Sequence, residues 1–462
     1  KKLSQILRMV FLKNCLLMLY IGLRVAMDDT LRIGVAGLGV VGGGLVKLVE
    51  EQNPLLEKRC GKKLKVVAVS AKNSKRISGP DISGYRWYDD PIALAEDSEV
   101  DVVCELIGGI CGAAFDLSKA ALSRGKHLVT ANKALLAQHG IELAEIAEES
   151  RVHLGYEAAI AGGIPIIKAL REGLCTNNFS SIYGILNGTC NYILTKMHEG
   201  VGKKNSQNFE DVLKEAQALG YAESDPSTDI DGIDSAHKLA MLASLAFGFS
   251  VDFDSVHTEG IRDISVLDMQ YAVELGYRIK LLGIAKSTDE GVEQSVHPCM
   301  VPEHSAISKV DGVLNAIVIK GNYVGTTTFE GPGAGALPTA SAVTADLMDI
   351  ARGMILPTFA IPVSQLNNKI KTNAKNRCAR YYIRLMVLDQ PGVIADITSR
   401  LRDLDVSVDA MIQHSHKDEE AVPVVLTTHL ANEDTILRAL GLIGELSSVI
   451  ESPRMFRIAH LE

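Results

Sequence analysis

The sequence predicts an α/β protein with a doubly wound parallel sheet, then an α+β domain, then a small C-terminal module of order β-α-β-β-α-β. Short apolar strand patterns alternate with helical patterns over residues 28–155, which is typical of a parallel sheet covered by helices. Residues 156–330 change to longer helices with strand-like runs between them. Residues 379–462 contain the third pattern.

Composition limits the classes of function. The 462 residues are too many for one hydrophobic core, so we expect two to four domains. The net charge of −9, without a basic cluster in the body of the chain, argues against nucleic acid as the main partner. The eight cysteines are scattered and form no C-x-x-C motif. They predict reduced thiols and a cytoplasmic protein.

The first residues differ from the rest of the chain. Residues 1–27 combine a basic start with an apolar run from Cys15 to Leu23, as in a signal peptide. The apolar run is too short to span a bilayer, and it ends at Met27, directly before the first predicted strand. We therefore expect a non-native or disordered extension, with Met27 as the natural start and no membrane association. Secretion is the weaker alternative.

The first domain is placed at residues 28–155. Its predicted strands are Leu31–Ala36, Lys65–Val69, Val100–Ile107 and His127–Thr130, and its predicted helices run from the first glycines to Val49, from Ala113 to Arg124 and from Gly140 to Glu149. The alternation of strand and helix predicts parallel pairing, because each helix returns the chain to the same end of the sheet.

The second domain is placed at residues 156–330. Its predicted helices are Ile164–Glu172, Asn191–Glu199, Phe209–Ala218, Ser235–Phe247 and Asp268–Leu282, and its predicted strands are Ser181–Leu186 and Gly312–Gly321. A further helix, Thr339–Ala351, follows the glycines of 331–335 and is expected to pack back on the first domain. Residues 331–365 would then complete that domain.

A polar linker at residues 366–378 precedes the C-terminal module. The module's predicted elements are the strands Arg380–Leu388, Val406–His414, Ala421–His429 and Met455–Ile458, and the helices Gly392–Leu404 and Asn432–Glu445. This order predicts a ferredoxin-like fold for residues 379–462.

A glycine motif, Gly37-Leu38-Gly39-Val40-Val41-Gly42, follows the first strand and opens a helix. This context is the one that a dinucleotide-binding fingerprint requires. Gly37 permits the tight turn, Gly39 lets a pyrophosphate approach the backbone, and Gly42 lets helix and strand pack closely. A glycine-rich turn without a ligand is the weaker alternative. The motif predicts a Rossmann-type domain.

The residues after the second strand bear on cofactor choice. No acidic residue follows Ser70 to bind a ribose 2′-hydroxyl, and three cations come close behind, namely Lys72, Lys75 and Arg76. This favours NADP, or use of both NADP and NAD. Cations in a surface loop are also common without any ligand.

The segment from Gly220 to Lys238 is the main candidate for chemistry. It holds five carboxylates, two glycines, one proline and one lysine, and it leads directly into an apolar helix pattern. Asp234 and Lys238 are four residues apart and would share one face of that helix. A lysine among carboxylates can donate or accept a proton. The alternative is a solvated loop with an ordinary ion pair.

Three more segments carry polar groups. Lys133 follows a strand at the carboxyl edge of the sheet, where it could contact nicotinamide or substrate, or be merely solvated. The loop from Glu157 to Pro165 could offer carbonyls and one carboxylate to a hard cation, or simply start a helix. Residues 187–192 could bind a polar ligand or cap a helix through Thr189. No histidine accompanies Cys190, so covalent catalysis is not expected.

Together and in this order, these segments resemble the homoserine dehydrogenase family, and the resemblance covers the chain from Leu31 onward. It is carried by ANK at 131–133, YEAAIAGGIPI at 156–166, NGTCNYIL at 187–194, the segment 216–238 and GPGAG at 331–335. The segment 216–238 is very specific, whereas the dinucleotide fingerprint is not. The tail around Asp389-Gln-Pro391-Gly392 resembles an ACT domain, a regulatory module common in amino-acid metabolism.

The resemblance implies reversible NAD(P)H-dependent reduction of L-aspartate 4-semialdehyde to L-homoserine, on the route to threonine, methionine and isoleucine. It makes Lys238 the proton donor, Lys133 a contact of cofactor and substrate, and Asp229 and Asp234 the carboxylates around the catalytic lysine. Glu223 would hold the substrate amino group. Further substrate contacts would be Asn187, Gly188, Thr189 and Tyr221. Cofactor contacts would be Gly37, Leu38, Gly39, Val40, Val41, Gly42, Lys72, Ile107, Gly108, Lys133, Gly333 and Gly335.

The resemblance also implies a structural sodium ion and regulation. Sodium would be held by Glu157 with backbone oxygens of Ile160, Gly162 and Ile164. An amino-acid effector, with L-threonine as the first candidate, would bind the C-terminal module at Asp389, Gly392 and Val393. A homodimer or homotetramer is expected.

Two other functions compete with this one. The first is a non-catalytic sensor that binds a dinucleotide and an amino acid, and the second is a dehydrogenase for another semialdehyde or a malate-like acid. The intact set of lysines and carboxylates argues against a sensor. The catalytic lysine itself is subject to opposed effects, because burial lowers its pKa and the aspartates raise it. The sequence does not decide between them.

Overall fold

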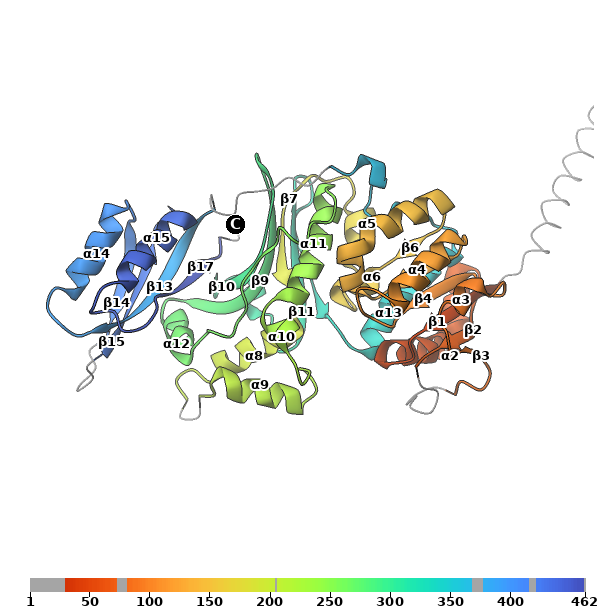
Figure 1. The fold of residues 1–462 in the computed structure, drawn as a ribbon, viewed down its shortest axis with the longest axis horizontal. Helices are drawn as coiled ribbons and strands as arrows, with labels where there is room; N and C mark the ends of the chain where they lie inside the picture. The colour runs from red at the N-terminus through yellow and green to blue at the C-terminus, as the bar shows by residue number, and fades with distance from the viewer. Residues whose placement is uncertain (1–29, 73–80, 204–205, 368–376, 415–420, 461–462) are drawn as a thin grey trace, which may run out of the picture.

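The computed structural model describes residues 30–72, 81–203, 206–367, 377–414 and 421–460. The predicted extension 1–27 and most of the predicted linker lie outside these residues. Within them the chain forms a six-stranded sheet and an eleven-stranded sheet, with the C-terminal module at the opposite end of the molecule from the first sheet (Figure 1). No described helix is long and apolar enough to cross a membrane.

The first sheet is parallel throughout and has the order β3-β2-β1-β4-β5-β6. Its strands are β1 Thr30–Ala36, β2 Lys63–Ser70, β3 Arg86–Tyr88, β4 Val102–Glu105, β5 His127–Thr130 and β6 Leu154–Gly155. The order reverses between β1 and β4, as in a doubly wound sheet. The predicted fold class is therefore confirmed, and β3 and β6 escaped prediction because they are only two or three residues long.

Helices cover both faces of this sheet, which is why its strands are apolar on both sides. They are α2 Val40–Cys60, α3 Ala93–Glu96, α4 Ala113–Ser123, α5 Lys133–Ser150 and α13 Ala336–Ala351. The helix α13 packs against α2, as Figure 1 shows, so a segment from late in the chain belongs to the first core. The predicted end of α2 at Val49 was wrong. The helix continues through Pro54 to Cys60, because Leu56 and Cys60 also reach the core, and Gly61 ends it with φ +80°.

The second sheet runs β12-β11-β7-β9-β10 through the middle of the molecule. These strands are β7 Phe179–Ile185, β9 Tyr277–Thr288, β10 Gly291–Pro302, β11 Leu314–Gly321 and β12 Gly325–Pro332, with the two-residue β8 His257–Thr258 beside β10. The helices of this part are α6 Glu157–Ala161, α7 Ile166–Lys168, α8 Gly188–Glu199, α9 Phe209–Ala218, α10 Ser227–Ile230, α11 Ile233–Phe247 and α12 Val266–Glu274.

One predicted helix in this region was wrong in its second half. The predicted helix 268–282 ends at Glu274, because Gly276 has φ +79° and the apolar residues beyond it pair as the strand β9. The predicted helix 164–172 is present at residues 166–173, where the single turn α7 continues as a π-helical turn at Ala169–Gly173. The strands β10 and β12 were not predicted.

The C-terminal module has the predicted order. Its elements are β13 Cys378–Leu388, α14 Val393–Asp403, β14 Val408–Gln413, β15 Ala421–Thr428, α15 Glu433–Gly444 and β17 Arg454–Ile458, with a short β16 at Ala431–Asn432. The strand β17 pairs with β13 on one side and, in parallel, with β10 on the other. The second sheet therefore continues without a break into the C-terminal module.

Candidate active site

The catalytic candidates gather where α5, α10 and α11 meet the end of β7. Gly232, with φ +83°, lets the chain turn into α11, whose first two turns carry Asp234 and Lys238. Lys133 is the first residue of α5, and its preceding residue Asn132 caps that helix by accepting a hydrogen bond from the backbone N–H of Leu135. The N-termini of two helices thus converge on one place.

Asp234 is shared by two lysines. Its Oδ1 lies 2.7 Å from the Nζ of Lys133, and its Oδ2 lies 2.8 Å from the Nζ of Lys238. The side chains of Asp234 and Lys238 are 4% and 9% exposed, whereas that of Lys133 is 38% exposed. The predicted pairing of Asp234 with Lys238 on one helix face is confirmed. The meeting of Lys133 with the same carboxylate joins residues that lie 101 positions apart.

The end of β7 supplies the remaining polar contacts. The backbone carbonyl of Leu186 accepts a hydrogen bond of 2.7 Å from Lys238 Nζ. The side-chain amide of Asn187 donates to Asp229 Oδ1 at 2.8 Å and to Asp234 Oδ2 at 2.9 Å. The hydroxyl of Thr189 lies 3.0 Å from Asp229 Oδ2 and 2.8 Å from the carbonyl of Tyr221. Leu186 acts through its backbone, so no side-chain pattern could have indicated it.

The two lysines differ in electrostatics. Burial lowers the pKa of Lys238, and this effect together with the charge of Lys133 outweighs the attraction of Asp234. Burial also acts to lower the pKa of Lys133, but the carboxylates of Asp234, Asp229 and Glu223 raise it above its usual range. Burial acts to raise the pKa of Asp234, yet the two lysines hold it well below its usual range. Of these three residues, only Lys238 has a pKa shift whose direction is set by burial.

The other predicted substrate residues lie around this cluster. Glu223 is exposed, and its charge acts on Lys133. The ring of Tyr221 lies 5.0 Å from that of Tyr192 between centroids. Gly188 opens α8, where a Cβ would lie 2.7 Å from the carbonyl oxygen of Val313. The glycine at 188 is therefore required by packing.

The glycine fingerprint has the geometry predicted for it. Gly37 has φ +95°, and a Cβ on Gly42 would lie 1.9 Å from the carbonyl oxygen of Gly37, so both positions need glycine. Gly39 caps α2, which begins at Val40, and a Cβ at Gly39 would meet nothing within 4 Å. Leu38 is buried, and Val41 packs partly buried against the first core, whereas Val40 is 73% exposed. The turn thus leaves open space at Gly39, where a phosphate would approach.

Two other segments border the fingerprint. A Cβ on Gly44 would lie 3.0 Å from the carbonyl oxygen of Ala336, so the turn at Gly335, which has φ +119°, lies beside α2. Gly333 also packs closely, since a Cβ there would overlap the side chain of Asn315. Lys72 is exposed at the end of β2. Its neighbours Lys75 and Arg76 lie outside the described residues.

The loop after β4 connects the fingerprint to the catalytic cluster. The backbone N–H groups of Ile107 and Gly108 donate to Glu105 Oε1 at 2.8 and 3.0 Å, so Glu105 orders this loop. The side chain of Asn132 donates to the carbonyl of Gly109 at 2.7 Å, which places the loop next to Lys133. Glu105 was not predicted as a site residue, and Asn132 was quoted only as part of the ANK motif, without a role. An asparagine directly before a helix was the available signal for the second.

Glu157 has partners of its own. Its two carboxylate oxygens accept hydrogen bonds from the backbone N–H groups of Ile167 at 2.8 Å and Lys168 at 2.9 Å, at the start of α7. Burial and the nearby Asp346 raise its pKa to about 7. The side chain of Glu157 therefore supports the interpretation of this loop as the start of a helix. Among the described residues, no group of three or more His, Cys, Asp and Glu side chains could hold a metal ion.

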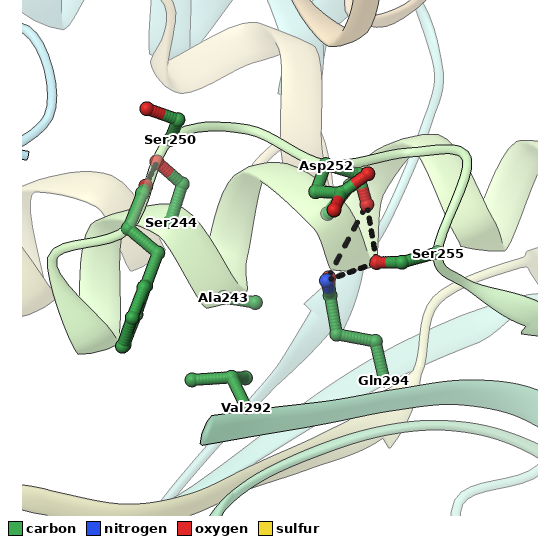
Figure 2. Close-up of a pocket in the computed structure, with 9 residues that line it drawn as sticks. Ala243, Ser244, Ser250, Asp252, Ser255, Val292 and Gln294 are labelled. Carbon is green, nitrogen blue, oxygen red and sulfur yellow. Dashed lines mark hydrogen bonds between the residues drawn. The ribbon is translucent and has the colours of Figure 1, made fainter. Parts of the chain in front are cut away.

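Cavities alone do not locate this site. A cavity of about 20 Å³ lies near the C-terminal end of α11. There Gln294 Nε2 donates to the carbonyl of Asp252 at 3.4 Å and to Ser255 Oγ at 3.2 Å, and these residues face one another in Figure 2. That volume suits about one water molecule. A cleft of about 840 Å³ lies where the second sheet continues into the C-terminal module, lined by residues of β7, β9, β10, β13 and β17. Neither Lys133 nor Lys238 is among the described residues that line these two spaces.

The predicted regulatory residues lie at the start of α14. Gly392 has φ +98° and precedes the helix, whose first residue Val393 is buried. Asp389 is exposed in the preceding loop. The backbone N–H of Val393 donates to the carbonyl of Gln390 at 3.4 Å.

Comparison with known proteins agrees with the geometry. A family model described as homoserine dehydrogenase matches residues 165–348, one described as homoserine dehydrogenase, NAD binding domain, matches residues 37–157, and one described as ACT domain matches residues 381–446. The resemblance and the predicted fold class are thereby confirmed.

Relatives cover nearly the whole chain. Homoserine dehydrogenase from Neisseria gonorrhoeae is 42% identical over 438 residues, which cover 93% of this chain and 98% of that protein. The enzyme from Bacillus subtilis is 36% identical over 433 residues, which cover 93% and 98%. The crystal structure of a homoserine dehydrogenase from Thiobacillus denitrificans is 41% identical with a TM-score of 0.87, covering 94% of this chain and 99% of that one. The chain therefore belongs to the homoserine dehydrogenase family of NAD(P)-dependent oxidoreductases.

Proposed function

We propose that this protein catalyses the reversible NAD(P)H-dependent reduction of L-aspartate 4-semialdehyde to L-homoserine. The observation that carries the proposal is the cluster of Lys133 and Lys238 on the single carboxylate of Asp234. The loop ordered by Glu105 connects this cluster to the glycine fingerprint. Family membership supports the choice of substrate.

The chemistry needs a proton donor at the aldehyde oxygen, where negative charge develops as hydride arrives. The reduced dinucleotide supplies the hydride when it is bound. We assign the donor role to Lys238. Two of its three ammonium protons are directed to the carbonyl of Leu186 and to Asp234, which leaves one for the substrate. Its lowered pKa favours proton release near neutral pH.

Neighbouring groups would bind the rest of the substrate. Lys133 has a raised pKa and so keeps its charge, which suits it to hold the substrate and the nicotinamide side of the site. Glu223 is an exposed carboxylate that suits an amino group, and Thr189 and Tyr221 lie beside Asp229 at the same edge. The side chain of Asn187 is already engaged by both aspartates, so its predicted role as a substrate contact is less favoured.

The test is oxidation of NADPH in the presence of L-aspartate 4-semialdehyde, with Lys238→Ala as the variant. We expect the turnover number to fall by about 100-fold or more, because general acid catalysis contributes on this scale. NADPH binding, measured by fluorescence, should be unchanged. Turnover that survives in the variant would move the donor role to Lys133 or to water. Cofactor binding without turnover in the wild type, with NADPH or NADH, would favour the sensor.

Preference for NADP is a finer proposal. The exposed Lys72 and the lack of an acidic residue directly after β2 support it. A related hyperthermophilic archaeal homoserine dehydrogenase, a mutant 27% identical to this chain, is known in complex with NADPH. A ratio of kcat/KM for NADPH over NADH that falls in Lys72→Ala would support the assignment.

The sodium ion proposed at Glu157, Ile160, Gly162 and Ile164 would depend on carbonyl oxygens. Both side-chain oxygens of Glu157 accept backbone N–H groups, and the carbonyl of Ile164 accepts a hydrogen bond from Ile166. The buried carboxylates of Glu157 and Asp346 would supply charge from a distance. A melting temperature equal in sodium and in a large organic cation at matched ionic strength would rule the ion out.

The remaining expectations stay predictions. They are an amino-acid effector, with L-threonine tested first, at Asp389, Gly392 and Val393; a homodimer or homotetramer; a cytoplasmic location; and the domain boundaries 28–155, 156–330, 331–365 and 379–462. The ACT match supports regulation in general. Loss of L-threonine inhibition after removal of residues 377–462 would support the effector site, and sedimentation would give the oligomeric state.

A further inference from the structure

Asn187 lies at the last position before α8, and its side chain is engaged at both ends. The oxygen Oδ1 accepts a hydrogen bond of 2.8 Å from the backbone N–H of Cys190, which caps the helix. The two protons of Nδ2 are directed to Asp229 at 2.8 Å and to Asp234 at 2.9 Å. The residue is 5% exposed. A side chain whose two donor protons are already used has little left to offer a substrate.

The amide sits between two carboxylates that come from different elements. Asp229 belongs to α10 and Asp234 to α11, and no cation bridges the two through a single side chain among the described residues. Asp234 is also held by its two lysines, and Asp229 by the hydroxyl of Thr189, but of the described residues only Asn187 joins the two like charges directly. The planar NH₂ group sets the separation and the orientation of both.

The same strand end also positions the lysine. Leu186, the residue before Asn187, accepts the hydrogen bond from Lys238 Nζ through its carbonyl. Asp234 Oδ2 therefore accepts one hydrogen bond from Asn187 and one from Lys238. Lys238 is itself held by Leu186, so both donors are tied to consecutive residues after β7. The direction of the Lys238 ammonium group depends on the position of Asp234, and Asn187 helps to fix that position.

We propose that Asn187 is a positioning residue for the reaction, which holds Asp229 and Asp234 in place so that Lys238 and Lys133 are aimed at the substrate. This role rests on the proposed function of the site, and it differs from the substrate contact that the family motif suggests. Asn187 acts through the two carboxylates and touches neither substrate nor cofactor.

Other titratable groups surround the amide and will affect any pH profile. They are Lys133 from α5, Cys190 from α8, Glu223 from the preceding loop, Asp229 from α10, Asp231 from the turn after it, and Asp234, His237 and Lys238 from α11. Loss of the amide removes a hydrogen bond to Asp234 and lets this carboxylate move away from Lys238. Because the charge of Asp234 raises the pKa of Lys238, a displaced Asp234 should move the alkaline limb of the kcat profile to lower pH.

The chain provides a matched control in Asn191, one turn along α8. Its side chain is also buried and also engaged at both ends, because Nδ2 donates to the carbonyls of Val310 and Leu314 at 3.0 Å each, and Oδ1 accepts from Lys280 at 3.0 Å. Among the described residues, its side chain forms no hydrogen bond with Asp229 or Asp234. Asn191→Ala should lower stability as Asn187→Ala does, without changing the reaction beyond its effect on the folded fraction.

The experiment compares Asn187→Ala and Asn191→Ala in the full-length enzyme, with kcat and KM for the semialdehyde measured between pH 5 and 10 per folded molecule. For Asn187→Ala we expect kcat to fall about 100-fold, the scale of a misplaced catalytic group, with KM changed less than about threefold. The alkaline limb should move to lower pH, and NADPH binding should persist. Asn191→Ala should keep the wild-type kcat and pH profile.

Three results would overturn the proposal. A rise in KM alone, with kcat retained, would show that the amide contacts substrate. An equal loss of kcat in both variants, tracking the folded fraction, would show a purely structural role. An unchanged pH profile in Asn187→Ala would show that the amide does not act through the carboxylates. Failure of the wild type to reduce the semialdehyde would instead contradict the proposed function itself, so the two failures are distinguishable.

Discussion

Asp234 is the residue on which the candidate site depends. It accepts hydrogen bonds from two lysines and one asparagine, from three separate elements. A carboxylate in this position keeps its charge despite burial, and its charge in turn opposes the desolvation of the lysines. The opposite pKa shifts of Lys133 and Lys238 follow from their exposure, since they share the same partner.

The lowered pKa of Lys238 predicts the pH dependence of reduction. The donor must be protonated, so kcat should fall as pH rises through its pKa, and this limb should lie below the value of about 10.4 that is usual for lysine. Lys133 lowers the pKa of Lys238 by charge repulsion, so Lys133→Met should move the limb to higher pH. Single-turnover rates across pH 6 to 11 would measure both. A limb that stayed in place in the variant would contradict the coupling.

Among the secondary-structure elements, the turn between β1 and α2 depends on two glycines in different ways. Gly42 is required by packing, because helix α2 approaches the carbonyl of Gly37 too closely for any side chain. Gly39 faces open space and has an ordinary φ of −75°. Packing and ligand access are thus separated within one turn.

This separation gives a paired prediction. Gly42→Ala should lower stability by about 1–3 kcal/mol or more, because its methyl group has no room and overpacking costs energy on this scale. Gly39→Ala should keep the wild-type stability but weaken NADPH binding at least tenfold, because the added methyl group occupies the phosphate approach. Chemical denaturation and fluorescence titration measure the two effects. Equal stability loss in both variants would contradict the assignment.

Across the whole molecule, the strand β17 joins the C-terminal module to the catalytic sheet. Arg457 on β17 forms hydrogen bonds of 2.8 and 2.9 Å to Glu259, and the same guanidinium also pairs with Glu433. Glu259 precedes Gly260, where a Cβ would lie 2.3 Å from the carbonyl oxygen of Ile230, next to the turn that starts α11. A contact made by the C-terminal module therefore lies one short segment away from the catalytic helix.

The Glu259–Arg457 contact should be pH-dependent. Burial acts to raise the pKa of Glu259, but hydrogen bonds from His257 and Arg457 hold it well below its usual range. A carboxyl group with a lowered folded-state pKa stabilises the protein above its unfolded pKa of about 4.3, and this stabilisation is lost as pH falls through the folded-state value. Glu259→Gln should therefore melt below the wild type at pH 7, and the gap should narrow toward pH 3.

The matched control for this prediction is Glu51→Gln, which breaks the exposed i,i+4 pair with Lys47 on α2. Exposed pairs of this kind contribute only about 0.3–0.5 kcal/mol, so its melting temperature should differ little from the wild type at any pH. A melting gap for Glu259→Gln that stays constant from pH 7 to pH 3 would show that the contact does not depend on the ionisation of Glu259.

Local patterns were sufficient for much of this protein. The alternation of strand and helix, the glycine fingerprint and the spacing of Asp234 and Lys238 are set within a few residues of one another, because helical period and turn chemistry are local properties. The C-terminal module was predictable for the same reason, element by element. Where local preference was ambiguous, as at 275–282, the predicted helix gave way to β9, whose neighbours in the sheet are distant in sequence.

The sequence by itself determined the fold class, the order of the elements, the family and the helix that carries Asp234 and Lys238. Only the tertiary structure decided that Lys133 meets Asp234, that Asn187 bridges two aspartates, that Glu157 caps a helix, and that β17 merges two sheets. It also decided the direction in which the pKa values of Lys133 and Lys238 are shifted. The reason is physical: burial and long-range pairing depend on which surfaces come together when the chain packs, and no local pattern of residues records that outcome.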